Sequence, residues 1–416
     1  MLIRRRKEKT KRKKEGCVGI CLIMKIDINK IKVVPKSVSN DFKLCIYGTP
    51  EKDVQEWIDN NLFEVEVTEK YTNIILPNDV QLSDIFLEIL KFEWMDGFSP
   101  NLNKKLHIGH FSNLVIGKAF KSLGICEKTV SIYGDTLDGE VKKEDAIQAL
   151  TKYQNDFQFF TDKSLMASEV KYNGDLLKDG KGDYEGTKIF EVGEDKIVAI
   201  KSTGQSSYFY QDVSLAEMLN APTLYLTGKE QCNHFDMLKR LFPNTQHIGL
   251  GLVKVSGLKM ASRIGNVILI EDFIEQVKET FNGNLQLIYN VFAGFILKSN
   301  PDVDKGINLD IISNPKNSAG LYLSYTMARL NSAGCELNHN GKFSSKELEF
   351  AYLKAKSNLK PNILFEALTV YCKEINSLYI NHTIKDNDDN KKMFDVMLSD
   401  LIYGFSKLGL FTIGKV

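Results

Sequence analysis

The feature that most limits the possible folds is an alternation of strand and helix patterns that begins near residue 91. "KFEWMDGF" has the pattern of a strand, residues 99–120 turn at Pro100 and continue as an apolar helical pattern, and "KTVSIYGD" is a second strand pattern. A strand, a helix and a strand in this order favour a βαβ unit of a parallel sheet. The alternation resumes after residue 205 with two helix and two strand patterns. The sequence therefore predicts an α/β fold with a doubly wound, Rossmann-type sheet.

The regions around this sheet have different patterns. Residues 25–90 alternate short strand patterns with one helical stretch, which predicts a small N-terminal α+β appendage. Residues 137–205 are polar and contain a stretch rich in Gly, Asp and Lys, and we interpret them as an insertion within a Rossmann unit that spans residues 91–275. Helical periodicity dominates residues 276–416 and predicts a C-terminal α-helical bundle.

Charge is distributed unevenly along the chain. Residues 1–16 contain nine Lys and Arg and two Glu, a net charge of +7, so residues 17–416 carry −6 of the total of +1. The body of the protein therefore cannot bind nucleic acid through bulk charge and would need local basic patches. Residues 1–24 fit a disordered basic and apolar tail, with a nucleic-acid-binding arm or a sorting signal as the alternative. Met24 is a second possible start.

The apolar runs and the cysteines bear on location. No stretch approaches the roughly 18 consecutive apolar residues that a membrane span needs, so no membrane association is expected. The seven cysteines are scattered and form no CxxC pair, which disfavours both a disulfide framework and a structural zinc site. A reducing, cytoplasmic location is expected.

The first candidate for chemistry is the run His107-Ile108-Gly109-His110, which opens the helical pattern after the first strand of the βαβ unit. The free N–H groups and the dipole of a helix N-terminus attract anions, and two imidazoles add donors beside them. This arrangement favours a phosphate ligand. Taken alone, the motif is interpreted equally well as a histidine pair with satisfied side chains.

The second candidate is the stretch 253–273, "VKVSGLKMASRIGNVILIEDF", which directly follows a strand pattern. It combines Lys254, Lys259 and Arg263 with two glycines, as a mobile cationic clamp for phosphate requires. An exposed basic loop is the alternative. Because open α/β sheets bind ligands at the carboxyl ends of their strands, the two candidates together favour one phosphate site.

These two stretches resemble the paired signatures of class I aminoacyl-tRNA synthetases, "HIGH" and "KMSKS". Residues 107–110 match the first in full, and "KMASR" at 259–263 matches the second with Ala and Arg substitutions. Other stretches are most similar to arginyl-tRNA synthetases: "SPNLNKKLHIGH" resembles "SPNxAKxxHxGH", "YFYQD" resembles "YxxRD", "GKEQCNHF" resembles "GxEQxxHF" and "YLSYTMARL" resembles "YLQYAHARI". The resemblance covers roughly residues 91–416.

The resemblance implies a ligase that uses ATP and Mg²⁺ to join L-arginine to tRNA(Arg) through an arginyl-adenylate. The catalytic residues that it implies are His107, His110, Lys259 and Arg263. The implied ATP-binding residues are Lys104, His107, Gly109, His110, Lys259, Met260 and Ser262. The implied arginine-binding residues are Asp96, Ser99, Asn101, Tyr208, Asp212 and Gln231, and those for tRNA are Tyr325, Arg329 and Asn376. A monomer without protein ligands to metal is expected.

The arginine site needs acids, because a guanidinium with five donors is best recognised by carboxylates, with an aromatic face to stack on. Asp96 stands where the resembled family has a Glu, and Asp212 and Tyr208 lie in the "YFYQD" stretch. The alternative for Asp96 is a turn residue, since Gly97 follows it. The alternative for Asp212 is a solvated carboxylate near a helix start.

The chain also departs from the resembled family. Arg263 keeps the charge of the second lysine of "KMSKS", Ala261 lacks a hydroxyl, and residues 134–137 lack the family's Trp. Residues 25–90 are shorter than the family's N-terminal tRNA-binding domain. Two alternatives therefore stay open: a paralogue that activates an amino acid for another acceptor, and a non-catalytic tRNA-binding protein.

Overall fold

The computed structural model describes most of the chain. The described residues are 3–5, 27–34, 42–60, 63–77, 80–86, 91–101, 105–133, 143–159, 161–255, 258–259, 268–308, 311, 314, 317–336, 341–384 and 387–414.

Five parallel strands form the central sheet, in the order β13-β12-β6-β7-β8. They are β6 (Phe92–Asp96), β7 (Cys126–Tyr133), β8 (Lys163–Met166), β12 (Thr223–Gly228) and β13 (Thr245–Leu250). The chain runs from β6 to β7 and β8, then returns to the other side of β6 with β12 and β13. Strand order therefore reverses between β6 and β12, the point where open α/β sheets bind ligands. The predicted Rossmann-type α/β fold is confirmed.

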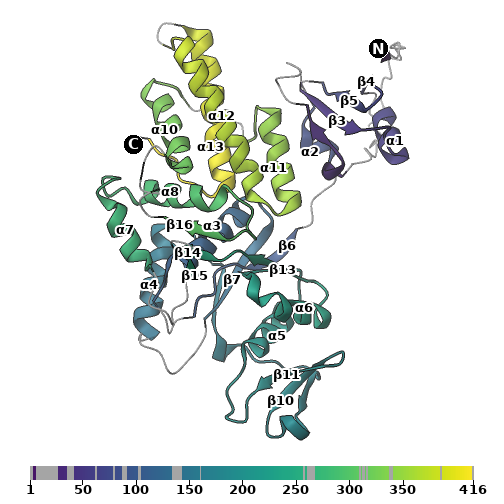
Figure 1. The fold of residues 1–416 in the computed structure, drawn as a ribbon, viewed down its shortest axis with the longest axis vertical. Helices are drawn as coiled ribbons and strands as arrows, with labels where there is room; N and C mark the ends of the chain where they lie inside the picture. The colour runs from purple at the N-terminus through teal and green to yellow at the C-terminus, as the bar shows by residue number, and fades with distance from the viewer. Residues whose placement is uncertain are drawn as a thin grey trace, which may run out of the picture.

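Helices cover both faces of this sheet (Figure 1). Alternate residues of a strand point to opposite faces. Leu224 and Leu226 of β12 accordingly join one hydrophobic core with α3 (Ile108–Ser122) and the C-terminal helices, whereas Tyr225 joins a second core with α5 (Tyr208–Leu219) and α6 (Cys232–Leu241). The two faces of the sheet are therefore covered by different helices and belong to different hydrophobic cores.

The region 137–205 differs from the expected insertion in one respect. The helix α4 (Lys143–Asp156) leads into β8, which pairs in parallel with β7 at the edge of the central sheet. An edge strand lacks the continuous apolar run of a central strand, which explains why the polar sequence of β8 suggested no sheet strand. After β8, the chain forms an antiparallel sheet of β9 (Leu177–Asp179), β10 (Lys188–Val192) and β11 (Asp195–Ile200), with the 3₁₀ turns Ala167–Glu169 and Gly182–Tyr184.

The N-terminal unit is an antiparallel sheet in the order β1-β4-β5-β3-β2 with α1 (Lys52–Asn60). The strands are β1 (Ile3–Arg5), β2 (Lys32–Val33), β3 (Lys43–Tyr47), β4 (Glu64–Val67) and β5 (Tyr71–Ile75), and a 3₁₀ turn spans Ile28–Lys30. Trp57 of α1 is buried in a separate core. Residues 3–5 were expected in a disordered tail, but they pair with β4; the rest of residues 1–24 lies outside the described residues.

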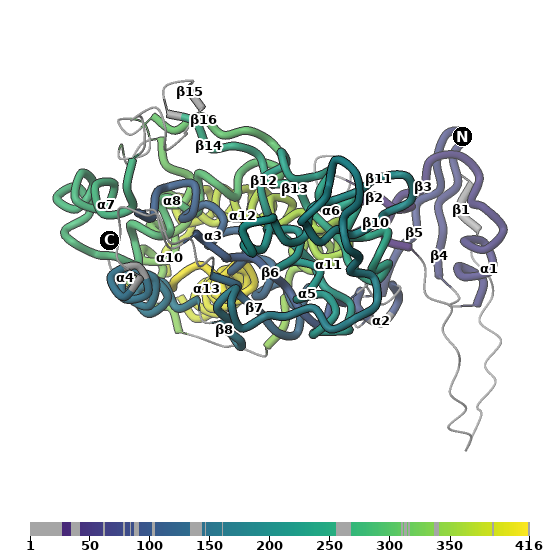
Figure 2. The backbone as a smooth tube through the Cα atoms, turned by 90° about the horizontal axis from the view of Figure 1, so that it is seen from below, coloured from purple at the N-terminus to yellow at the C-terminus, as the bar shows by residue number. Residues whose placement is uncertain are grey.

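This unit lies at one end of the molecule (Figure 2) and contacts the helix α11 (Lys346–Asn358). Glu349 of α11 is 8% exposed, and its Oε1 accepts hydrogen bonds from the N–H groups of Leu82 and Ser83, at 3.1 and 3.3 Å. These are the first residues of the short helix α2 (Leu82–Ile85). Phe86 then packs edge-on against Phe350. The contact thus combines a helix cap with apolar burial.

The C-terminal part is helical. Its helices are α7 (Ile270–Lys278), α8 (Leu285–Leu297), α10 (Ala319–Ser332), α11, α12 (Pro361–Asn381) and α13 (Asp388–Leu408). Helices α8 and α10 approach so closely at Gly320 that a Cβ there would lie 1.9 Å from the carbonyl oxygen of Asn290. The contact therefore requires glycine at this position. In the described part of the chain, no helix is long and apolar enough to cross a membrane.

Candidate functional site

The first carboxylate of the candidate site is Asp96, the last residue of β6 at the point where strand order reverses. It is 5% exposed, and the Ser99 hydroxyl donates to its Oδ1 at 2.5 Å. Ser99 Oγ also accepts from the N–H of Ile132 in β7, at 2.9 Å, so the turn after β6 is fixed to the neighbouring strand. Burial, with a smaller contribution from the Asp212 carboxylate, raises the pKa of Asp96 to about 7 against the opposing effect of the Ser99 hydrogen bond.

The second carboxylate, Asp212, comes from α5 on the face of the sheet that Asp96 shares with Tyr225. Its Oδ2 lies 2.6 Å from Nε2 of His234 on α6. His234 in turn packs edge-on against Phe209, with ring centroids 5.1 Å apart. The imidazole therefore fixes the direction of the carboxylate. Sequence reasoning missed His234, although it lies within the "GKEQCNHF" stretch.

A third polar group, the hydroxyl of Tyr225, was also missed. Tyr225 is fully buried in β12, lies opposite Asp96 in the strand register, and its hydroxyl has no hydrogen-bond partner. Burial, and then the charges of Asp212 and Asp96, raise the pKa of this phenol well above its ordinary value. A buried hydroxyl without a partner, within reach of the charges of two carboxylates, marks a place where a polar ligand would fit.

We expect Tyr225→Phe to raise the free energy of unfolding of the ligand-free protein by about 1 kcal/mol, because an unpaired buried hydroxyl is costly and Phe keeps the ring. The ring contact with Phe235, at 4.9 Å between centroids, would persist. Urea denaturation of the two proteins measures the difference. A loss of stability would show that the hydroxyl has a partner in solution.

The other predicted arginine-binding residues lie around the same turn and helices. The Nδ2 of Asn101 donates to the hydroxyl of Tyr208, the first residue of α5, at 3.0 Å. Tyr208 is 57% exposed, so its ring is accessible at the rim. Gln231 is exposed; it is the last residue of the 3₁₀ turn that follows β12 and the N-cap residue of α6.

His107 and His110 form the start of α3. The N–H of Gly109 donates to Nδ1 of His107 and the N–H of His107 donates to Nδ1 of His110, both at 3.1 Å. The two rings stack with centroids 3.8 Å apart. A neutral imidazole whose Nδ1 accepts a hydrogen bond carries its proton on Nε2. Both histidines are thereby set as Nε2–H donors at a helix N-terminus, where an anion is favoured.

The backbone joins the two signature stretches. His107 forms a β-bridge with Leu269, the N–H of Ile108 donates to the carbonyl of Ile268 at 3.1 Å, and the N–H of Ile270 donates to that of Leu106 at 3.2 Å. The segment that follows the predicted cationic loop therefore runs beside the first histidine.

The loop itself is described only at its start. Lys259 ends the short strand β15 (Leu258–Lys259), and its backbone pairs with Lys254 in β14 (Val253–Val255). Four other predicted site residues lie outside the described residues: Lys104, Met260, Ser262 and Arg263. Their roles stay predictions.

The predicted tRNA-binding residues form one cluster on α10 and α12. Arg329 donates from Nη1 to Oδ1 of Asn376 at 2.6 Å and from Nη2 to the hydroxyl of Tyr325 at 2.9 Å. Its guanidinium also stacks over the rings of Tyr325 and Tyr379. Tyr325 is 46% exposed. The cluster is therefore a preorganised surface group with an accessible aromatic ring.

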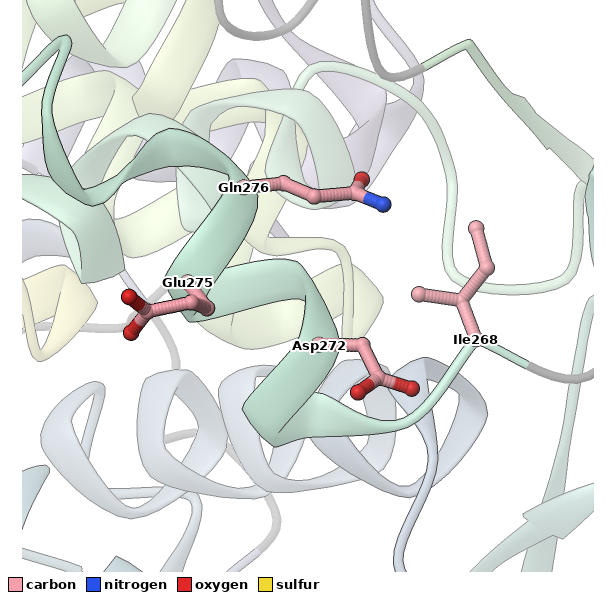
Figure 3. A pocket seen from close by; sticks show the side chains of 4 residues that line it. All are labelled: Ile268, Asp272, Glu275 and Gln276. Carbon is pink, nitrogen blue, oxygen red and sulfur yellow. The ribbon is translucent and has the colours of Figure 1, made fainter.

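A hollow of about 500 Å³ lies along α7 (Figure 3). It is lined by Ile268, Asp272, Glu275 and Gln276. Two carboxylates and no cation make it a poor site for phosphate, although it adjoins the end of the predicted loop.

Comparison with known proteins finds relatives that are similar in sequence. No protein-family model matches the chain. The arginine–tRNA ligase of Lactobacillus johnsonii is 26% identical over 337 residues, which cover 69% of this chain and 56% of the relative. That of Clostridium botulinum (strain Loch Maree) is 23% identical over 479 aligned positions, covering 82% of this chain and 84% of the relative. The chain thus spans about half the length of several relatives that it matches.

Solved arginyl-tRNA synthetase structures have a similar fold. Thermus thermophilus arginyl-tRNA synthetase superposes with a TM-score of 0.66 at 14% identity, covering 93% of this chain and 96% of that structure. The arginyl-tRNA synthetase of Plasmodium falciparum has a TM-score of 0.62 at 16% identity, with coverage of 93% and 95%. In sequence the chain is similar to curated arginine–tRNA ligases, and in fold it is similar to solved arginyl-tRNA synthetases.

Proposed function

We propose that this protein ligates arginine to tRNA(Arg), with ATP as the activating substrate and an arginyl-adenylate as the intermediate. The observation that carries the proposal is the pairing of two sites at one end of the central sheet. Asp96 and Asp212 lie close enough to interact beside a buried, unpaired hydroxyl, and His107 and His110 form the start of α3, each with Nδ1 accepting a backbone hydrogen bond.

The acid pair suits a guanidinium. Asp96 and Asp212 lie close enough that the charge of one raises the pKa of the other, and a cation with five donors relieves such repulsion. The accessible ring of Tyr208 supplies a face for the same group. A site that must pair one buried and one partly buried carboxylate rejects analogues without the guanidinium, by as much as about 10⁴–10⁵-fold.

The histidine pair suits the phosphates of ATP. Arginine's carboxylate would attack the α-phosphorus, forming the adenylate and releasing pyrophosphate. The Nε2–H groups of His107 and His110 would stabilise charge that develops on the phosphate oxygens, and we assign Lys259 and Arg263, with Lys104, Met260 and Ser262, to the same nucleotide. Mg²⁺ usually keeps several waters and binds through substrate phosphates, so we propose that it enters bound to ATP.

For the second substrate, we assign the cluster of Tyr325, Arg329 and Asn376 to tRNA. The exposed aromatic ring and the stacked guanidinium are groups that bind unstacked bases and phosphates. We further propose a cytoplasmic, monomeric enzyme. The location is supported by the five cysteines within the described residues, which are all free thiols.

Arginine affinity should depend on pH through Asp96. The pKa of this carboxyl, about 7 in the protein without ligand, means that half of the molecules are protonated at pH 7. Only the ionised form pairs with a guanidinium, so the KM for arginine should rise about tenfold between pH 8 and pH 6. Asp96→Asn should have a higher KM that is flat over this range. An Asp96→Asn profile as steep as that of the parent protein would assign the titration to another group.

The decisive experiment is a charging assay with radiolabelled arginine, ATP and total tRNA, run beside ATP–pyrophosphate exchange with and without tRNA. Arginyl-tRNA formation supports the proposal. Exchange without charging would instead favour an enzyme that passes the activated amino acid to another acceptor. Tight tRNA binding without ATP consumption would favour a non-catalytic RNA-binding protein.

A further inference from the structure

The carboxylate of Asp304 joins two lysines from different parts of the site. Its Oδ1 accepts from Nζ of Lys229 at 2.5 Å and from the N–H of Leu252 at 2.9 Å, while its Oδ2 lies 2.8 Å from Nζ of Lys254. The Asp304 side chain is 28% exposed, and the hydrogen bonds from both lysines hold its pKa well below the usual range. The carboxylate is therefore ionised at neutral pH.

The two lysines belong to the two halves of the proposed reaction site. Lys229 follows β12 directly and lies two residues before Gln231, which we assign to the amino acid. Lys254 lies in β14 and pairs through its backbone with Lys259, the first residue of the "KMASR" run. One carboxylate thus connects the turn that holds the amino acid with the strand that leads into the phosphate loop.

Backbone hydrogen bonds also fix the segment that carries Asp304. The N–H of Gly251 donates to the carbonyl of Pro301 and that of Lys305 to the carbonyl of Leu252, both at 2.9 Å. A Cβ on Gly251 would lie 2.1 Å from the carbonyl oxygen of Val303, so the two segments are in backbone contact. The strand β16 (Lys305–Ile307) then pairs in parallel with β14.

The side chain of Lys305 adds a further restraint. It is buried, and its Nζ donates to the carbonyls of Asn300, Pro301 and Val303, at 3.2, 3.3 and 2.9 Å. Three carbonyl acceptors on one ammonium fix the curvature of the segment that presents Asp304. The carboxylate is therefore presented from a rigid support.

The geometry points to Asp304 as a positioning residue of the arginine-activating reaction: through Lys229 and Lys254 it holds the start of the phosphate loop in a fixed place relative to the amino-acid turn. This inference rests on the proposed function. It changes the role of Lys254, which the sequence grouped with Lys259 and Arg263 as a phosphate ligand. Lys254 is already engaged by Asp304, so its role is to anchor the strand.

The test replaces Asp304 by Asn, which keeps size and one acceptor but removes the charge that pairs with the lysines. We expect kcat for arginine-dependent pyrophosphate exchange to fall about ten- to a hundredfold, because misplacement of a reacting group by about 1 Å has an effect of this size. The KM for arginine should stay within about twofold. Amide hydrogen exchange at β14 and β15 should become about tenfold faster, whereas β12 and β13 should be unchanged.

A double-mutant cycle distinguishes an anchor from a general loss of stability. If Asp304 acts through Lys254, Lys254→Met and Asp304→Asn should together cost little more than Asp304→Asn alone. The matched control is Asp179→Asn, which removes an ion pair with Lys188 on the exposed β9–β10 pair and should change none of these quantities.

Unchanged hydrogen exchange at β14 and β15, an unchanged kcat, or fully additive effects in the cycle would each overturn the inference. Hydrogen exchange is measured without substrate, so it separates the two proposals. A parent protein that charges no tRNA would overturn the proposed function. Faster amide hydrogen exchange at β14 and β15 in Asp304→Asn would still show that Asp304 holds these strands in place.

Discussion

Replacing Asp212 by Asn should lower kcat/KM for arginine about 10²–10³-fold, because one partner of a buried charge pair contributes roughly 2–5 kcal/mol when truncated. Asn keeps the size of the side chain and can still contact His234, which lies 2.6 Å from Asp212 in the parent protein. The change therefore removes charge and little else. The KM for ATP should stay within about twofold, since His107 and His110 are untouched.

The control is Asp236→Asn, an exposed carboxylate on the neighbouring helix α6. It removes the same charge from the same face of the sheet and should leave both constants within about twofold, since exposed charges interact weakly. Steady-state exchange kinetics with arginine and ATP varied in turn measure both constants. If the KM for ATP rose as much as that for arginine, the assignment of Asp212 to the guanidinium would be wrong.

The second large effect is expected for His110→Asn. An Asn amide oxygen can replace Nδ1 as the acceptor for the N–H of His107, a bond of 3.1 Å, but it leaves no donor in the place of Nε2. We therefore expect kcat for pyrophosphate exchange to fall about 10²–10³-fold, the usual effect of removing one donor to a charge that develops in the transition state. The free energy of unfolding should change by less than about 0.5 kcal/mol, because the cap of α3 is kept.

The comparison variant is His382→Asn at the end of α12, where Nδ1 lies 3.0 Å from the carbonyl of Leu378. This variant also replaces a histidine by asparagine, but at an exposed position, and it should leave kcat unchanged. Urea denaturation and exchange kinetics on the same preparations separate stability from rate. A parallel loss of stability and rate in His110→Asn would mean that the imidazole acts by holding the structure at the start of α3, for instance through its stacking on His107.

Sequence reasoning predicted the fold well because the central strands are strongly patterned. The inner strands β6, β7 and β12 were predicted within the βαβ alternation from their apolar runs, and so was the edge strand β13, whose stretch is also largely apolar. The strand β8 was hidden in the polar region 137–205, since an edge strand needs no such run. Whether β8 joins the central sheet depends on its pairing with β7, which the sequence of β8 alone does not reveal.

The candidate site was predictable only where a side chain is in a recognisable motif. His107, His110, Asp96 and Asp212 have motif positions, whereas Tyr225 lies in an apolar strand. Its hydroxyl becomes notable only when the strand register places it opposite Asp96.

His234 and Asp304 were missed for a related reason. Each acts on a residue of another element, Asp212 on α5 and Lys254 on β14, and such pairs are formed by tertiary packing. Lys254, which lies near a phosphate motif in sequence, is paired with the carboxylate of Asp304 in space, and no sequence pattern indicates this pair.

The helix cap between Glu349 and α2 bears on how far this chain can be shortened. A chain that began at residue 91 would lose two of the N–H donors to a carboxylate that is 8% exposed, and would uncover the ring of Phe350. Buried polar groups that lose partners, and apolar rings that meet water, both reduce stability and solubility. The N-terminal unit therefore completes the surface of the helical bundle, and a minimal active fragment would need replacements at Glu349 and Phe350 before it could stand alone.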